Sequence, residues 1–441
     1  MREDEIRPTI PDVGRRKDED ELSLYGDEQD APLRRRRRPS HPAKKKKKRG
    51  HRAPVKRKRR KRRSFFEWLF AGTAPRKRTS GLRLFGKDIR LSFWPTFLIV
   101  AALLIVSVVF LQSTNITVDE EKVTLVGLPG NLEGYRILHI SDLAGKRFGD
   151  GQATILREIG TLDYDCVLLT GDMVGKGGDP EPFYELLEGL PSRKPVYFIA
   201  GDSDPGPVRK AAREITGTVE EMVLEDWVLG AVERGATYVD APVRLAVGDS
   251  VVWITPADML NLNASEMVAT CKAQMEQEQE GTVLGLQADY DTLPATTYRF
   301  ERATRLLDAV NRMSETDVHL SLAHEPPSDA FLRASASHDT PDEKFLTQPS
   351  IVLAGHYCGG VWRLPFLGAF YIPSATADRH GWLPAQQDVK GLSAVSETHL
   401  YITAGLSTPG SAPFMAFRML NSPEISVIEL TATLPESMLE R

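Results

Sequence analysis

The chain is 441 residues long, and its formal net charge of −4 conceals a strong internal asymmetry. The stretch from Arg34 to Arg63 holds 20 of the 56 Lys and Arg residues and no acidic residue, which leaves 36 basic against 60 acidic residues elsewhere. This length allows one large folded domain with appendages, and three cysteines are too few for a disulfide-stapled scaffold. The sequence therefore predicts an acidic domain joined to a basic tail.

Residues 1–63 are polar, charged and nearly free of large apolar groups. They cannot bury enough surface to offset the ordering entropy, so we expect a disordered, polybasic cytoplasmic tail. Its basic runs predict attraction to anionic lipid headgroups, at about 1 kcal/mol per basic residue near the surface, with simple solvation as the alternative. No aromatic or fold signature points to a specific nucleic acid. Residues 64–90 continue as a basic juxtamembrane segment.

The segment from Leu91 to Leu111 contains no charged residue. About 20 apolar residues span the hydrocarbon core of a bilayer, so this segment predicts an uncleaved transmembrane anchor, with a buried core helix as the alternative. The basic excess lies on its N-terminal side, which predicts that this side is cytoplasmic. We therefore expect a single-pass protein of the cell membrane whose C-terminal domain, residues 115–432, is extracytoplasmic.

The C-terminal domain alternates strand and helix patterns. Residues 115–129 predict a first edge strand, because apolar and polar residues alternate there. Further strands are expected at 236–240, 243–247 and 251–255, and helices at 152–162, 180–190, 227–234, 263–280 and 296–314. This order predicts an α/β (α+β) fold of mixed sheets with covering helices.

Five short apolar runs end abruptly in acidic residues or histidines. In chain order, the side chains at these ends belong to Asp142, Asp172, Asp202, His324 and His356. Runs of that length bounded by turn residues are typical of strands buried on both faces, and ligand sites gather where such strands end. We therefore expect these five side chains to lie close together.

The order of these blocks resembles the calcineurin-like metallophosphoesterases, specifically their membrane-anchored bacterial branch. Asp142, Gly171-Asp172, Gly201-Asp202, His324 and Gly355-His356 stand in the order of the family's conserved motifs, and the flanks GKRFG and GGVWRLPFLGAFYIPS agree as well. The resemblance covers roughly residues 135 to 430. It implies a two-sheet β-sandwich flanked by helices, and metal-dependent hydrolysis of phosphoesters.

Four positions depart from the family pattern. Ala144 and Cys358 replace two histidines that hold metal in the family, and Asp202 replaces an asparagine. Ser203 stands where the family has the histidine that serves as general acid or charge stabiliser, so the catalytic residue is unknown. Losing such a group typically costs ~10²–10⁴-fold in rate.

The resemblance assigns the remaining residues to two ion sites. One ion would be held by Asp172, Asp202, His324 and His356, a set that suits Mn, Fe or Zn. The other site retains only Asp142 and the shared Asp172, with Cys358 as a substitute whose thiolate would favour zinc. We therefore predict one ion rather than two.

Two functions stay open. The first is a membrane-anchored phosphoester hydrolase with an altered, single-metal site, acting on a phosphoester near the outer leaflet. That substrate rests on the anchor and the family alone. The second is a catalytically silent relative that keeps the fold as a binding or scaffold module at the membrane. Whether the chain is an enzyme is thus undecided by its sequence.

Overall fold

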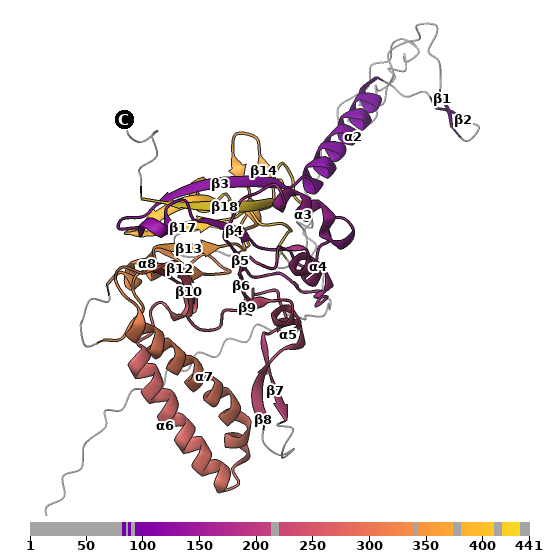
Figure 1. Ribbon diagram of the computed structural model, residues 1–441. Coiled ribbons are helices and arrows are strands. Elements are labelled where there is room, and N and C mark those ends of the chain that lie inside the picture. Colours follow the sequence, from indigo (N-terminus) through magenta and orange to yellow (C-terminus); the bar gives the residue numbers. More distant parts are fainter. Residues whose placement is uncertain are drawn as a thin grey trace, which may run out of the picture. The chain divides into compact units, whose positions relative to one another are not determined.

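The computed structural model describes residues 82–84, 87–89, 93–212, 220–337, 343–373, 381–409 and 417–432 (Figure 1). The predicted tail, residues 1–63, lies outside these residues, as does most of the segment 64–90. Within that segment the short strands β1 (Leu82–Leu84) and β2 (Lys87–Ile89) pair antiparallel.

Helix α2 (Phe93–Thr114) covers most of the predicted anchor. Among the residues that the structure describes, however, no helix is both long and apolar enough to cross a bilayer. The structure thus gives the predicted anchor at 91–111 no support, and the location of the protein stays a prediction.

Two six-stranded sheets form the body of the domain. The first has the order β3-β18-β4-β5-β6-β9, and the second β10-β11-β12-β13-β17-β16. The strands of the first are β3 (Thr117–Thr124), β18 (Glu424–Thr431), β4 (Arg136–Ile140), β5 (Cys166–Thr170), β6 (Val196–Ile199) and β9 (Ala236–Tyr238). Those of the second are β10 (Val243–Val247), β11 (Ser250–Pro256), β12 (Val318–Leu322), β13 (Ile351–Ala354), β17 (Thr398–Ile402) and β16 (Gly391–Val395).

The central strands of each sheet run parallel. β4 pairs with β5, β5 with β6 and β6 with β9 in the first sheet. In the second, β11, β12, β13 and β17 pair in the same way. Parallel strands present their carboxyl ends at one edge, and this edge is where the predicted side chains emerge.

Apolar side chains of both sheets meet in one buried layer. Ile137 and Leu168 of the first sheet share this cluster with Leu320 and Leu353 of the second. Because successive strand residues point to opposite faces, Leu138 and Leu169 face outward instead. The strands are therefore apolar on both faces, as their sequences indicated.

Helices cover both outer faces (Figure 1). The first sheet packs against α3 (Ala153–Ile159), α4 (Glu181–Gly189) and α5 (Asp226–Glu233). The second packs against parts of α6 (Ala264–Val283), α7 (Gln287–Arg312) and α8 (Asp329–Ser335), and α6 and α7 lie side by side. The predicted mixed α/β fold is thereby confirmed for the described part of the domain.

Two hairpins were missed by the sequence analysis. β7 (Val208–Ala212) pairs with β8 (Glu220–Leu224) just before the predicted helix at 227–234, in a region where no strand was expected. β14 (Arg363–Leu364) pairs with β15 (Gly368–Ala369). Helix α7 also begins earlier than predicted and contains Pro294, which lacks the N–H of an interior helix position. Short 3₁₀ turns occur at Gly130–Leu132, Asp150–Gln152, Ala257–Met259, Cys358–Gly360 and Gln386–Asp388.

Candidate metal centre

Side chains from both sheets converge at one edge of the sandwich. Asp142, Asp172 and Asp202 follow β4, β5 and β6 of the first sheet, whereas His324 and His356 follow β12 and β13 of the second. Potential ligand atoms of Asp202, His324 and His356 lie within 4.8 Å of one another, and so do those of Asp142, Asp172 and His324. We call the first set the Asp202 corner. Asp142 with Asp172 forms the Asp142 corner.

Left-handed backbone conformations turn these side chains into the site. Asp142, Asp172 and His356 have φ values of 57°, 51° and 66°, which are unfavourable for residues with a Cβ atom. Such strain is typical of functional sites, where the surrounding structure enforces it. Glycine gives the necessary room: a Cβ atom at Gly355 would lie 2.0 Å from Ser141 Oγ.

His324 is oriented by the main chain of the opposite sheet. Its Nδ1 lies 2.8 Å from the carbonyl oxygen of Thr170, which can only accept, so Nδ1 carries the hydrogen. Its Nε2 then faces Asp202 Oδ1 at 2.9 Å and His356 Nδ1 at 3.0 Å. A histidine held through its other nitrogen in this way is the usual arrangement of a metal ligand.

Charge at the Asp202 corner favours a cation. Hydrogen bonds with His324 and His356 lower the pKa of Asp202, whose side chain is half-exposed. Burial by itself lowers the pKa of His324, but hydrogen bonds to Asp172 and Asp202 outweigh it and raise the pKa well above its usual value. Two imidazoles and carboxylate oxygens converging on one point fit a divalent ion such as Mn, Fe or Zn.

The Asp142 corner is closed by the protein itself. Asp142 Oδ2 accepts a hydrogen bond from the main-chain N–H of His356 at 3.1 Å, and the Cys358 thiol lies 3.8 Å from Asp142 Oδ1. Burial raises the pKa of both Asp142 and Cys358. Ala144 offers no ligand atom, and Cys358 belongs to neither set of converging ligand atoms among the described residues. The Cys358 thiol thus lies against the Asp142 carboxyl group, and its role as a metal ligand stays a prediction.

Asp204 has a role that the sequence analysis did not assign. Its carboxylate accepts the backbone N–H groups of Gly201, Met173, Val174 and Gly175 at 2.7 to 3.3 Å. Asp204 thus ties the loop after β6 to the loop after β5. Ser203, next to it, donates its own N–H to Asp172 Oδ1 at 2.9 Å. The loop that carries Asp202 is therefore held by main-chain hydrogen bonds.

Arg418 was also missed. This guanidinium is only 1% exposed, and it donates to the carbonyl oxygens of Ala404, Ser407, Asn421 and Ser422. Asn421 in turn donates to the carbonyl oxygen of Cys358 at 2.8 Å. Arg418 therefore fixes the segment that backs the Asp142 corner. Nothing in the sequence distinguishes this arginine from an exposed one.

Two further histidines are buried and belong to neither set of converging ligand atoms. His139 bonds to Thr170 Oγ1 at 2.8 Å. His319 lies 2.8 Å from Thr255 Oγ1 and 2.7 Å from the carbonyl oxygen of Thr347. His338 and His380 lie outside the described residues.

Comparison with known families decides the relationship. A model of the calcineurin-like phosphoesterases matches residues 135–359, just over half of the chain. The chain belongs to the calcineurin-like phosphoesterase family. The match spans all five residues at the strand ends, from Asp142 to His356, and membership implies a divalent metal cofactor.

Among solved structures, this chain is similar to the phosphopantetheinyl hydrolase of Mycobacterium tuberculosis. It shares 11% identity, and the alignment covers 66% of this chain and 98% of that one with a TM-score of 0.30. A comparison with curated protein sequences gave no significant match.

Proposed function

We propose that this protein hydrolyses phosphoesters at a centre with one divalent cation, held by Asp202, His324 and His356 with Asp172 beside them. The observation that carries this proposal is the meeting of two imidazoles and a carboxylate. Asp202 Oδ1 lies 2.9 Å from His324 Nε2 and 3.2 Å from His356 Nδ1. Asp172 Oδ1 lies 3.4 Å from the same nitrogen of His324.

A bound divalent cation at such a centre supplies a hydroxide nucleophile near neutral pH and positive charge for phosphoryl oxygens. The protein itself would orient the residues that hold this cation. Thr170 holds the His324 ring, and the Ser203 N–H holds Asp172. Ser203 has no side-chain group that protonates a leaving alkoxide near neutral pH. We therefore expect esters of acidic alcohols, such as aryl phosphates, to react faster than alkyl phosphates.

One ion is favoured over two by the contacts of Asp142. One carboxyl oxygen of Asp142 accepts the main-chain N–H of His356, and the other lies against the Cys358 thiol. The side chain is also buried. Attachment to a membrane, a substrate near the outer leaflet and headgroup binding by the basic tail rest on sequence alone, and they remain part of the proposal on that footing.

The test uses the full-length chain purified without added metal. We expect elemental analysis to give one Mn, Fe or Zn ion per chain after reconstitution, and turnover of aryl phosphates or diesters only in the loaded protein. His324→Ala should lose both, and His319→Gln, a buried histidine elsewhere, should keep both. Turnover that persists with a chelator present would overturn the proposal.

The second candidate is a silent relative that binds without hydrolysis. Ala144, Ser203 and the thiol of Cys358 favour it, because each takes the place of a family histidine. A loaded protein that hydrolyses no aryl ester, but does so after Ala144→His, Ser203→His and Cys358→His are combined, would establish this candidate instead.

A further inference from the structure

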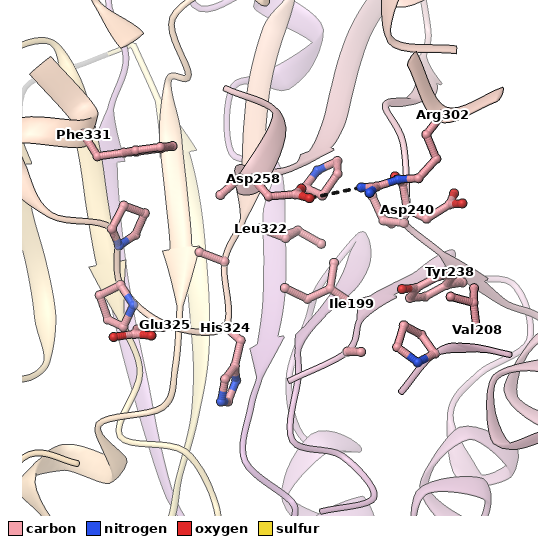
Figure 2. A pocket seen from close by; sticks show the side chains of 18 of the residues that line it. Ile199, Val208, Tyr238, Asp240, Asp258, Arg302, Leu322, His324, Glu325 and Phe331 are labelled. Carbon is pink, nitrogen blue, oxygen red and sulfur yellow. Dashed lines mark hydrogen bonds and ion pairs between the residues drawn. The ribbon is translucent and has the colours of Figure 1, made fainter. Parts of the chain in front are cut away.

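A cavity of about 660 Å³ shares His324 with the Asp202 corner. Figure 2 shows His324 at one end of it and the ion pair of Arg302 with Asp258 at the other. Pockets that hold drug-sized ligands are typically about 300–1,000 Å³. The cavity is therefore large enough for a whole organic group next to the metal centre.

The walls of the cavity are mainly apolar and come from both sheets and their helices. Ile199 and Tyr238 belong to the first sheet, Leu322 to the second, Val208 to the β7–β8 hairpin, and Phe331 to α8 (Figure 2). Apolar walls with few polar groups favour alkyl and aryl ligands, because burying a hydroxyl group without a partner is unfavourable.

The charged groups at the end of the cavity away from His324 pair with each other. Arg302 Nη2 lies 3.1 Å from Asp258 Oδ2, and its Nε donates to the carbonyl oxygen of Asp240. Arg305 binds both carboxylate oxygens of Asp240 at 2.7 Å, and the Tyr298 hydroxyl donates to one of them at 2.8 Å. The far end of the cavity therefore carries matched charges rather than a binding site for a second phosphate.

We propose that this cavity receives the alcohol part of the phosphoester and selects bulky alkyl or aryl alcohols over sugars and nucleosides. The inference rests on the proposed function for the place of the phosphoryl group, which lies at the His324 end. The apolar group then extends between Ile199 and Leu322 toward Phe331.

Chain length is the expected determinant of affinity. Each methylene group that enters an apolar site contributes about fourfold to binding. Lengthening a butyl group to an octyl group, which adds four methylenes, should therefore strengthen binding roughly 200-fold. A polar group of similar size should gain far less, because its hydroxyl groups lose water without finding partners.

The experiment separates the cavity from the chemistry. Binding of butylphosphonate and octylphosphonate, which cannot be hydrolysed as esters, is measured by calorimetry on the full-length protein loaded with Mn²⁺, below the micellar concentration. Hydrolysis of 4-butylphenyl and 4-octylphenyl phosphate, in which the alkylated phenol is the alcohol released, is measured in parallel. Val208→Glu places a charge on the cavity wall, and Val126→Glu is the matched control at a fully exposed turn.

We expect octylphosphonate to bind roughly 200-fold more tightly than butylphosphonate, with most of this preference lost in Val208→Glu and kept in Val126→Glu. The same preference without any turnover would support the cavity while removing the hydrolase. Turnover with equal kcat/KM for the 4-butylphenyl and 4-octylphenyl esters would overturn the cavity while keeping the hydrolase. A preference that survives Val208→Glu would also overturn it.

Discussion

The Asp202 corner and the Asp142 corner use similar residue types in opposite surroundings. The Asp202 side chain is 51% exposed and faces two imidazoles, whereas Asp142 is 3% exposed and touches a main-chain N–H and a thiol. A Cβ atom at Gly405 would lie only 2.5 Å from Asp142 Oδ2, so the protein packs tightly against this acid.

If the proposed single-ion centre is right, this difference explains how one half of a two-ion site could be lost while its acid remains. Asp142 has partners within the protein, a main-chain N–H and a thiol, which stabilise it without a cation. At the Asp202 corner the carboxylate is half-exposed and its ligand atoms converge with those of two imidazoles, an arrangement that could hold a cation. Each of the following predictions bears on this contrast, and the largest expected effect comes first.

Removing His324 should have the largest effect, because its Nε2 belongs to both sets of converging atoms. We expect His324→Ala to weaken Mn²⁺ or Zn²⁺ binding by more than about 100-fold, since even partners outside the ligand set contribute ~10–100-fold. Calorimetric titration measures this, with His319→Gln as the control. An affinity within tenfold of the unmodified protein would contradict the assignment.

The two acids should respond differently to loss of charge. We expect Asp202→Asn to weaken metal binding by about tenfold, because the amide oxygen still ligates but the charge is gone. Asp142→Asn should change it by less than about threefold, since this acid bonds to the protein instead. Calorimetric titrations of both variants with the same metal ion measure this difference. If both substitutions weaken binding equally, the ion contacts both corners and the contrast is lost.

Cys358 should act as packing rather than as a ligand. We expect Cys358→Ser to alter metal affinity by less than about threefold. The thiol is 0% exposed, so iodoacetamide should label the peptide that contains Cys358 only after the chain is unfolded. Mass spectrometry of labelled peptides gives the answer. Labelling in the folded protein that bound Zn²⁺ suppresses would show instead that the thiol ligates.

The last prediction concerns the stability of the fold and a buried histidine that lies away from the site. Burial lowers the pKa of His319 to about 4, so the folded state stays neutral there while the unfolded state takes up a proton near pH 6.5. The stability due to neutral His319 is present above pH 6.5 and is lost as pH falls toward 4, by up to about 3 kcal/mol.

His319→Gln should therefore flatten the acid slope of the unfolding free energy by up to ~1.4 kcal/mol per pH unit in this window. Urea unfolding at pH 7, 6, 5 and 4 measures the slope, and Gln keeps polar atoms for Thr255 and Thr347. An unchanged slope would mean that His319 is protonated in the folded protein.

The sequence predicted the side chains of the site because they depend on local pattern. A buried strand followed by an acid or histidine can be recognised within about ten residues, as at Asp142, Asp172 and His324. Parallel order then brings these ends together. The helices α4 and α5 were predicted for the same reason, since their apolar spacing is local.

The features that the sequence did not predict depend on contacts that no short sequence pattern reveals. Strands β7 and β8 carry mixed charged and apolar residues and form a hairpin next to α7, which follows far along the chain. The cavity beside His324 has walls from residues as far apart as Ile199 and Phe331. Arg418 is buried although arginine is usually exposed, because the carbonyl oxygens of Ser407 and Ala404 and of residues just after it accept its N–H groups, an arrangement that no local sequence pattern predicts.

His324 enters from one sheet, yet its ring is held by Thr170 at the end of a strand in the other. A cation shared by His324 and Asp202 would join the two halves of the sandwich, so its binding free energy adds to their association. At 100 times its dissociation constant, such an ion would contribute about 2.7 kcal/mol to the folded state. In a cell deprived of that ion, the protein would be less stable and would be degraded by proteases more readily. Its abundance would then follow the supply of the metal.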